Sequence, residues 1–186
     1  MHWIPFLIAS FVVAAIQQSL GRVWTFGHVG PDLLAILSML AALRARTATQ
    51  AALAAWVLGL LADLTTASGP AGATVIGPMS VGYVVAATGV FRVREMFFAE
   101  HPLAQLFLAG AFCAVSHTIW IIAQMLLGPV PLTLPDFVQT MGNMLGIALY
   151  TAVVAMVLSL PLRYLGGLLG VPATRALRRH RRRTSL

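Results

Sequence analysis

The chain is divided into long apolar stretches, and most of its charged residues fall in the short segments between them or in the segment after the last one. Only 9% of the 186 residues are charged, 59% are hydrophobic, and the mean hydropathy is +0.88. A soluble domain carries about 25% charged residues, so this chain has too few to cover a globule in water. The apolar composition also excludes a disordered chain. The sequence therefore predicts an all-α polytopic membrane protein.

Six stretches are candidates for transmembrane helices, because a helix needs about 20 apolar residues to cross about 30 Å of hydrocarbon. Charges and clusters of Pro and Gly separate them. The expected helices cover residues 3–20, 31–43, 51–67, 73–91, 103–127 and 136–162. We expect a six-helix transmembrane domain over residues 1–162 and a basic cytoplasmic tail over residues 163–186.

The second expected helix, residues 31–43, is short. At 1.5 Å per residue it reaches only about 20 Å, so residues 23–30 would have to cover the remaining depth. That segment contains Gly27, His28 and Gly30. Irregular backbone at membrane depth is tolerated only inside a protein or beside water. We therefore expect residues 23–30 to be packed against other helices.

The distribution of arginine predicts the orientation. All 12 basic residues are Arg, and with the N-terminus inside, every one except Arg22 falls on the inner side. This bias follows the positive-inside rule and predicts that both termini are cytoplasmic. A cleavable signal peptide is not expected, because no basic residue precedes the first apolar stretch.

The end of the chain is strongly basic. Each basic residue near an anionic leaflet contributes about 1 kcal/mol to membrane association, so we expect the tail to bind anionic lipid at the membrane surface. A cytoplasmic protein partner is the alternative, and nucleic-acid binding is not expected. The six arginines concerned are Arg175, Arg178, Arg179, Arg181, Arg182 and Arg183.

Asp63 is an acid about one turn inside the outer end of the third apolar stretch. A charged residue near the bilayer centre costs about 2.5–3.5 kcal/mol on insertion scales, so it rarely faces lipid. We expect Asp63 to accept hydrogen bonds from backbone N–H groups of the turn at 68–72 or of the start of the next helix. A role in handling a proton or ligand is the alternative. Its helical face carries small residues that permit close helix contact, namely Ala51, Ala55 and Gly59.

Asp32 directly follows Pro31 at the expected start of the second helix. An acid in the first turn interacts favourably with the positive end of the helix dipole, so we expect a capping role. Pairing with His28 or Arg22 is the alternative.

Polar side chains also gather on one face of each of the last two expected helices. They are able to line a shared polar cavity, but interhelical hydrogen bonds, worth about 0.6 kcal/mol per pair, are the expected role. The residues of these faces are Gly110, Cys113, His117 and Gln124 on the fifth helix and Gln139, Asn143, Gly146 and Tyr150 on the sixth.

The sequence contains no motif typical of a catalytic or metal site. The single cysteine, Cys113, excludes a disulfide framework or a cysteine metal site, and His117 has no second histidine nearby to complete a metal site. An intramembrane hydrolase that uses Asp32 and Asp63 as an aspartyl pair is the enzyme alternative. No flanking motif fixes the two carboxylates in the geometry that such a pair requires. We expect no enzyme activity, no metal and no cofactor.

Several short motifs lie between residues 23 and 92. They are Gly30-Pro31-Asp32-Leu33-Leu34, Arg44-Ala45-Arg46, Gly59-Leu60-Leu61-Ala62-Asp63, Gly69-Pro70-Ala71-Gly72, and Gly82-Tyr83. Together with the chain length and the six expected spans, these motifs resemble the rod shape-determining protein MreD family. That family usually has Pro-Leu-Gly in the turn, so Ala71 is a departure.

The resemblance implies a non-enzymatic protein of the bacterial inner membrane that maintains cell shape within the cell-elongation machinery. MreD-like proteins associate with the single-pass membrane protein MreC. Through it they are linked to the MreB filament, the glycosyltransferase RodA and a class B penicillin-binding transpeptidase. The implied role is scaffolding or regulation of lateral peptidoglycan synthesis. The residues that would then serve the fold or contact a partner are Pro31, Asp32, Gly59, Asp63, Pro70, Gly72 and Tyr83.

The implied architecture also looks like that of the S-components of energy-coupling-factor vitamin transporters, which are six-helix proteins of about this length. S-components tend to dock on their coupling protein through Ala-x-x-x-Ala in the first helix. Here the first expected helix offers only Ser10-x-x-x-Ala14, and Ala51-x-x-x-Ala55 lies in the third. A vitamin-binding S-component is therefore the alternative function. The polar faces of the last two helices keep it open, since a binding cavity would need them.

Overall fold

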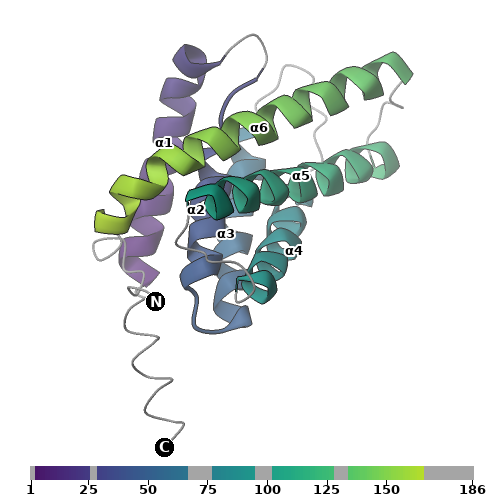
Figure 1. Ribbon diagram of the computed structural model, residues 1–186. Helices are drawn as coiled ribbons and strands as arrows, with labels where there is room; N and C mark the ends of the chain where they lie inside the picture. Colours follow the sequence, from purple (N-terminus) through teal and green to yellow (C-terminus); the bar gives the residue numbers. More distant parts are fainter. Residues whose placement is uncertain (1–2, 26–28, 67–76, 95–101, 128–133, 166–186) are drawn as a thin grey trace, which may run out of the picture.

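The computed structural model describes residues 3–25, 29–66, 77–94, 102–127 and 134–165. These residues form six helices and no strand, as expected for an all-α protein (Figure 1). The helices are α1 (Trp3–Trp24), α2 (Leu33–Arg44), α3 (Ala48–Thr66), α4 (Pro78–Val93), α5 (Pro102–Leu127) and α6 (Leu134–Leu165).

Each expected helix is present, with ends that differ by a few residues. α1 continues beyond Leu20 to Trp24, so Arg22 lies within the helix and not in a loop. α6 continues to Leu165, which places its last residues in the segment expected to be tail. The remainder of that tail lies outside the described residues.

The expectation that residues 23–30 pack inside the bundle is wrong for the first part of this segment. The side chain of Val23 is 73% exposed, and Thr25 is also exposed. Because α1 continues through Val23, its backbone hydrogen bonds are made within the helix, and the segment needs no shelter from neighbours. Val29, in contrast, is partly buried and packs against Gly146 of α6.

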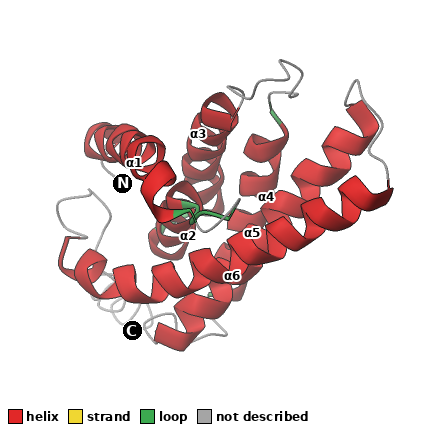
Figure 2. Cartoon of the chain, turned by 90° about the horizontal axis from the view of Figure 1, so that it is seen from above, coloured by secondary structure: helices red, strands yellow, loops and turns green. Residues whose placement is uncertain are grey.

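α2 is the central helix of the protein. Every side chain from Leu34 to Leu43 is buried, and α2 contacts all five other helices. Figure 2 shows α2 in the middle, with α1, α3 and α4 around it and the α5–α6 pair along one side. A helix that is apolar on all faces is stable only when it is surrounded, and this explains why the shortest helix occupies the core.

α5 and α6 cross the rest of the bundle. They pack against each other, and α5 also packs against α4. α1 is seen nearly end-on in Figure 2, whereas α5 and α6 extend lengthwise in both Figure 1 and Figure 2. The pair therefore lies at a steep angle to α1, and the six helices are not a simple parallel bundle.

Three helical segments are long and apolar enough to cross a membrane: Ala48–Thr65, Leu103–Leu127 and Phe137–Leu158. In the other three helices the apolar stretches found among the described residues are shorter, namely Trp3–Ser19, Leu33–Arg44 and Pro78–Val93. Large apolar side chains are exposed on the outside, for example Ile4, Leu126 and Leu149. Soluble monomers rarely expose extensive apolar surface, so these features are those of a membrane protein.

Two glycines bring the backbones of α3, α4 and α5 into contact. A Cβ atom added at Gly59 would lie 2.6 Å from Ser80 Cα and 2.9 Å from the carbonyl oxygen of Met79. A Cβ atom added at Gly82 would lie 2.7 Å from the carbonyl oxygen of Ser116. The small-residue face expected on α3 is therefore the face that packs closely against α4.

We predict that Gly59→Ala destabilises the protein, because the new methyl group meets backbone atoms that have no rotamer to change. Overpacking of this kind costs about 1–3 kcal/mol. The matched control is Gly89→Ala on α4, where an added Cβ atom meets nothing within 4 Å. Ala in place of a helical Gly contributes about 0.5–1 kcal/mol, so the control should be slightly stabilised. Thermal unfolding in detergent measures both, and equal melting temperatures would contradict the close contact.

Candidate functional site

The buried start of α2 is held by polar side chains from other helices. Asp32 is the N-cap, and its Oδ1 accepts a hydrogen bond from the backbone N–H of Ala35 at 3.0 Å. The backbone N–H of Asp32 donates to Thr151 Oγ1 of α6 at 2.9 Å, and that of Leu34 donates to Gln17 Oε1 of α1 at 3.1 Å. The first N–H groups of a helix have no partner within it. These bonds satisfy the N–H groups of Asp32, Leu34 and Ala35 inside the bundle and confirm the expected capping role of Asp32.

Tyr83 of α4 binds the second oxygen of the same carboxylate. Its hydroxyl donates to Asp32 Oδ2 at 2.6 Å, and its ring packs edge-on against Phe112 with centroids 5.2 Å apart. Tyr83 is fully buried and Asp32 is 7% exposed. Of the alternative partners considered for Asp32, His28 lies outside the described residues, as does the side chain of Arg22. The carboxylate thus joins the start of α2 to the middle of α4.

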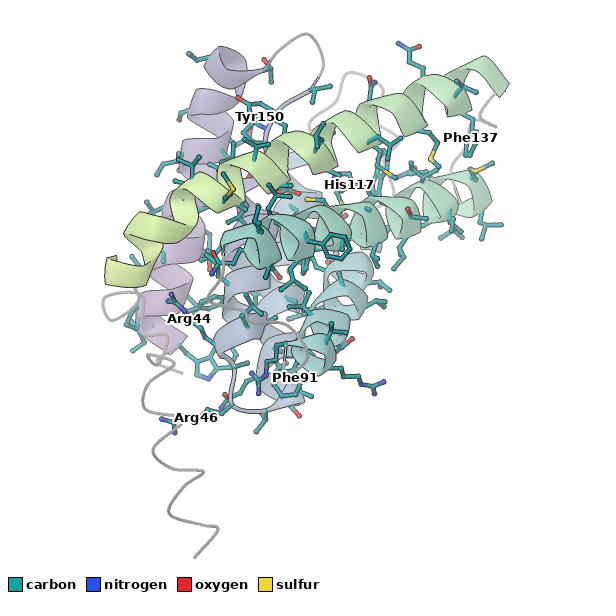
Figure 3. All side chains as sticks on the ribbon, viewed as in Figure 1. Arg44, Arg46, Phe91, His117, Phe137 and Tyr150 are labelled. Carbon is teal, nitrogen blue, oxygen red and sulfur yellow. The ribbon has the colours of Figure 1, made fainter. Side chains whose placement is uncertain are left out.

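Cys113 and His117, one turn apart on α5, lie beside this carboxylate. One oxygen of Asp32, the sulfur of Cys113 and a ring nitrogen of His117 all lie within 4.8 Å of one another. Nδ1 of His117 is 3.0 Å from the backbone oxygen of Cys113, and the hydroxyl of Ser116 donates to the same oxygen at 3.1 Å. Figure 3 shows His117 on α5 where α5 and α6 run side by side.

The cluster of Asp32, Cys113 and His117 was not predicted from the sequence, where His117 has no evident metal-binding partner. Asp32 is far from Cys113 along the chain, and only the packing of α2 against α5 brings them together. The available signal was the Cys113-x-x-x-His117 spacing, which places two side chains with ligand atoms on one helix face. We name these three residues the Asp-Cys-His cluster.

Asp63 forms a second buried carboxylate site, at the start of α4. Its Oδ1 accepts from the backbone N–H of Met79 at 3.2 Å, and its Oδ2 accepts from the N–H and the hydroxyl of Ser80 at 3.0 and 2.9 Å. Asp63 is only 3% exposed. Asp63 thus accepts hydrogen bonds from backbone N–H groups at the start of the following helix, which is one of the two arrangements expected from the sequence. Pro70 and Gly72 of the preceding turn lie outside the described residues.

The polar faces expected to meet between α5 and α6 do so only in part. Gln139 is exposed, whereas Gln124 and Asn143 are partly buried. The first turns of α6, near Phe137, project past the group formed by the first four helices (Figure 3). Gln139 lies in this projecting part and therefore does not face the interior. Within the described residues, the buried Nε2 of Gln124 has no hydrogen-bond partner.

Basic residues gather at the opposite end of α2. The guanidinium of Arg94 donates to the backbone oxygen of Ala45 at 2.6 Å and lies 4.0 Å from the ring centroid of Phe91. Arg44, Arg46 and Phe91 lie at the same end of the bundle in Figure 3. Positive charge at a helix C-terminus is favoured by the helix dipole. The six arginines of the tail, from 175 to 183, lie outside the described residues.

No protein-family model, curated protein or solved structure matches the chain. The described part of the chain offers two buried carboxylates, each positioned at the start of a helix. One of them, Asp32, also has a thiol and an imidazole beside it.

We predict that Asp63→Leu is much more destabilising than Asp63→Asn. Leucine leaves two backbone N–H groups of α4 and a hydroxyl buried without an acceptor, at a cost of about 1–3 kcal/mol for each. Asparagine keeps one carbonyl oxygen that accepts from this helix start. Unfolding in detergent, followed by circular dichroism, compares the two variants. Equal losses in both would argue for a role that depends on the charge of Asp63.

We predict that Tyr83→Phe lowers the free energy of unfolding by about 1.5–3 kcal/mol, the usual contribution of a hydrogen bond to a charged group. The ring and its contact with Phe112 remain. Thr88→Val, which removes an exposed hydroxyl bonded to the Val85 carbonyl on the same helix, should change stability by no more than about 0.5 kcal/mol. Similar melting temperatures for the two variants would show that the Tyr83 hydroxyl does not support the cap.

Proposed function

We propose that the protein is an MreD-like, non-enzymatic component of the bacterial inner membrane that supports cell shape and lateral peptidoglycan synthesis. The observation that carries this proposal is the hydrogen bond between Asp32 and Tyr83, since it joins two motifs on which the family resemblance rests. The other motif residues, Gly59 and Asp63, fix α3 against α4 in the same core. A scaffold acts by presenting helices in a fixed arrangement, so its characteristic residues belong in helix contacts.

Six membrane crossings with both termini in the cytoplasm are part of this proposal. The start of α1 lies at the same end of the bundle as Arg44, Arg46 and Phe91 (Figure 1, Figure 3). Arginine-rich ends favour the cytoplasmic side of the membrane. In this proposal α1, α2 and α4 cross the membrane as well as α3, α5 and α6.

The proposed direct partner is a single-pass membrane protein of the MreC type. Through it the chain would be connected to MreB, RodA and a class B penicillin-binding transpeptidase, as the family resemblance implies. The arginine-rich tail would add contact with anionic lipid. No catalytic residue is assigned in this proposal.

A vitamin-binding S-component is the second candidate, and the structure provides an observation against its usual docking mode. The residues of α1 that correspond to a small-residue docking pair are Ser10 and Ala14. Ser10 is fully buried, its hydroxyl bonded to the backbone oxygen of Phe6, and Ala14 is 7% exposed. Both face the interior of this bundle, so they are not available to a coupling protein.

We predict that the tagged protein, purified from its native membranes in mild detergent, brings with it an MreC-type single-pass protein identified by mass spectrometry. A membrane protein of unrelated function, carrying the same tag and expressed to the same level, controls for detergent carry-over. Recovery of a coupling protein with paired ATPases would contradict the scaffold and establish the transporter function.

A further inference from the structure

We infer that the Asp-Cys-His cluster binds a zinc ion that links the start of α2 to α5. Zinc takes cysteine sulfur, histidine nitrogen and carboxylate oxygen as ligands, and the cluster offers one of each. Calcium and magnesium take oxygen ligands, so a thiol and an imidazole select against them. The inference goes beyond the scaffold proposed above and does not depend on it. It replaces the expectation from the sequence that the chain holds no metal, because the fold adds Asp32 to Cys113 and His117.

The distances allow coordination with small side-chain movements. The three ligand atoms lie within 4.8 Å of one another. Tetrahedral zinc with bonds of about 2.0–2.3 Å holds its ligand atoms about 3.5 Å apart. To reach that spacing, ligand atoms that lie up to 4.8 Å apart have to approach one another by about 1.3 Å. Three protein ligands leave the fourth position for water.

The ligands are already oriented by neighbouring groups, as is usual around metal sites. Nδ1 of His117 is 3.0 Å from the backbone oxygen of Cys113, and an N–H donated there leaves Nε2 with its lone pair for a metal. The hydroxyl of Tyr83 holds one oxygen of Asp32. Thr151 accepts from the backbone N–H of Asp32 and so holds the start of α2 against α6.

The negative charge of the buried Asp32 carboxylate favours the binding of a cation. The described partners of the Asp32 carboxylate are neutral groups, the N–H of Ala35 and the hydroxyl of Tyr83. A buried carboxylate is costly unless a positive charge or hydrogen bonds compensate it. Asp32 accepts two hydrogen bonds, whereas Asp63 accepts at least three. Among the described residues, only Asp32 lies in a cluster with a thiol and an imidazole. The cation therefore belongs at Asp32.

The test uses the full chain in mild detergent with an affinity tag that contains no histidine. The protein is stripped with a chelator, and cobalt or zinc chloride is then added. Cobalt bound to a thiolate gives a charge-transfer absorption band in the near ultraviolet. Because the chain has a single cysteine, such a band can only arise from Cys113. Zinc retained per chain and the melting temperature are measured in parallel.

We expect the band in the wild-type protein, about one retained zinc ion per chain, and a higher melting temperature with zinc. Cys113→Ser and His117→Gln should each lose the retained zinc and the rise in melting temperature. The matched control is Ser116→Ala, which removes a neighbouring buried hydroxyl that is not a ligand, and it should behave as wild type. If a ligand variant fails to fold, the wild-type cobalt spectrum still decides the question. Absence of the band, or an equal effect of zinc on the ligand variants and the control, would overturn the site.

Discussion

The structure depends on starting a helix inside an apolar bundle. Membrane interiors provide no water to satisfy the first N–H groups of a helix, so α2 can occupy the centre only if side chains satisfy them. Asp32, Thr151 and Gln17 do this from three parts of the chain. Once the start of α2 is satisfied, its apolar remainder is free to contact every other helix. The same cap therefore supports the core and brings chemically reactive side chains close together.

Local features of this fold were predictable because they depend on residues close together in the chain. Pro31 followed by Asp32 indicates a capped helix start, and an acid in an apolar helix indicates a nearby set of backbone donors, as found for Asp63. The four-residue spacing that places Gly59 and Asp63 on one face indicates a close helix contact. Each inference needs only helix geometry and the high cost of an unpaired polar group.

Features set by packing between distant segments were not predictable. Nothing in the sequence pairs Tyr83 with Asp32, because that contact depends on how α4 is rotated against α2. The steep angle between the α5–α6 pair and α1 likewise leaves no periodic signal in the sequence. Within this pair Gln139 is exposed, whereas His117 lies beside Asp32. The true end of α1 near Trp24 was missed because Arg22 suggested a loop, although the helix continues through it.

Which substitutions can accumulate during evolution depends on whether a glycine faces backbone or a side chain. At Gly59 the opposing atoms are Ser80 Cα and the backbone oxygen of Met79. Every amino acid has these backbone atoms, so no substitution at position 79 or 80 makes room for a side chain at position 59. Gly146 of α6 instead faces the methyl groups of Val29. A residue smaller than valine at position 29 would therefore make room for a residue larger than glycine at position 146. Among descendants of this gene, position 59 should therefore remain glycine without covariation, whereas positions 29 and 146 should vary together.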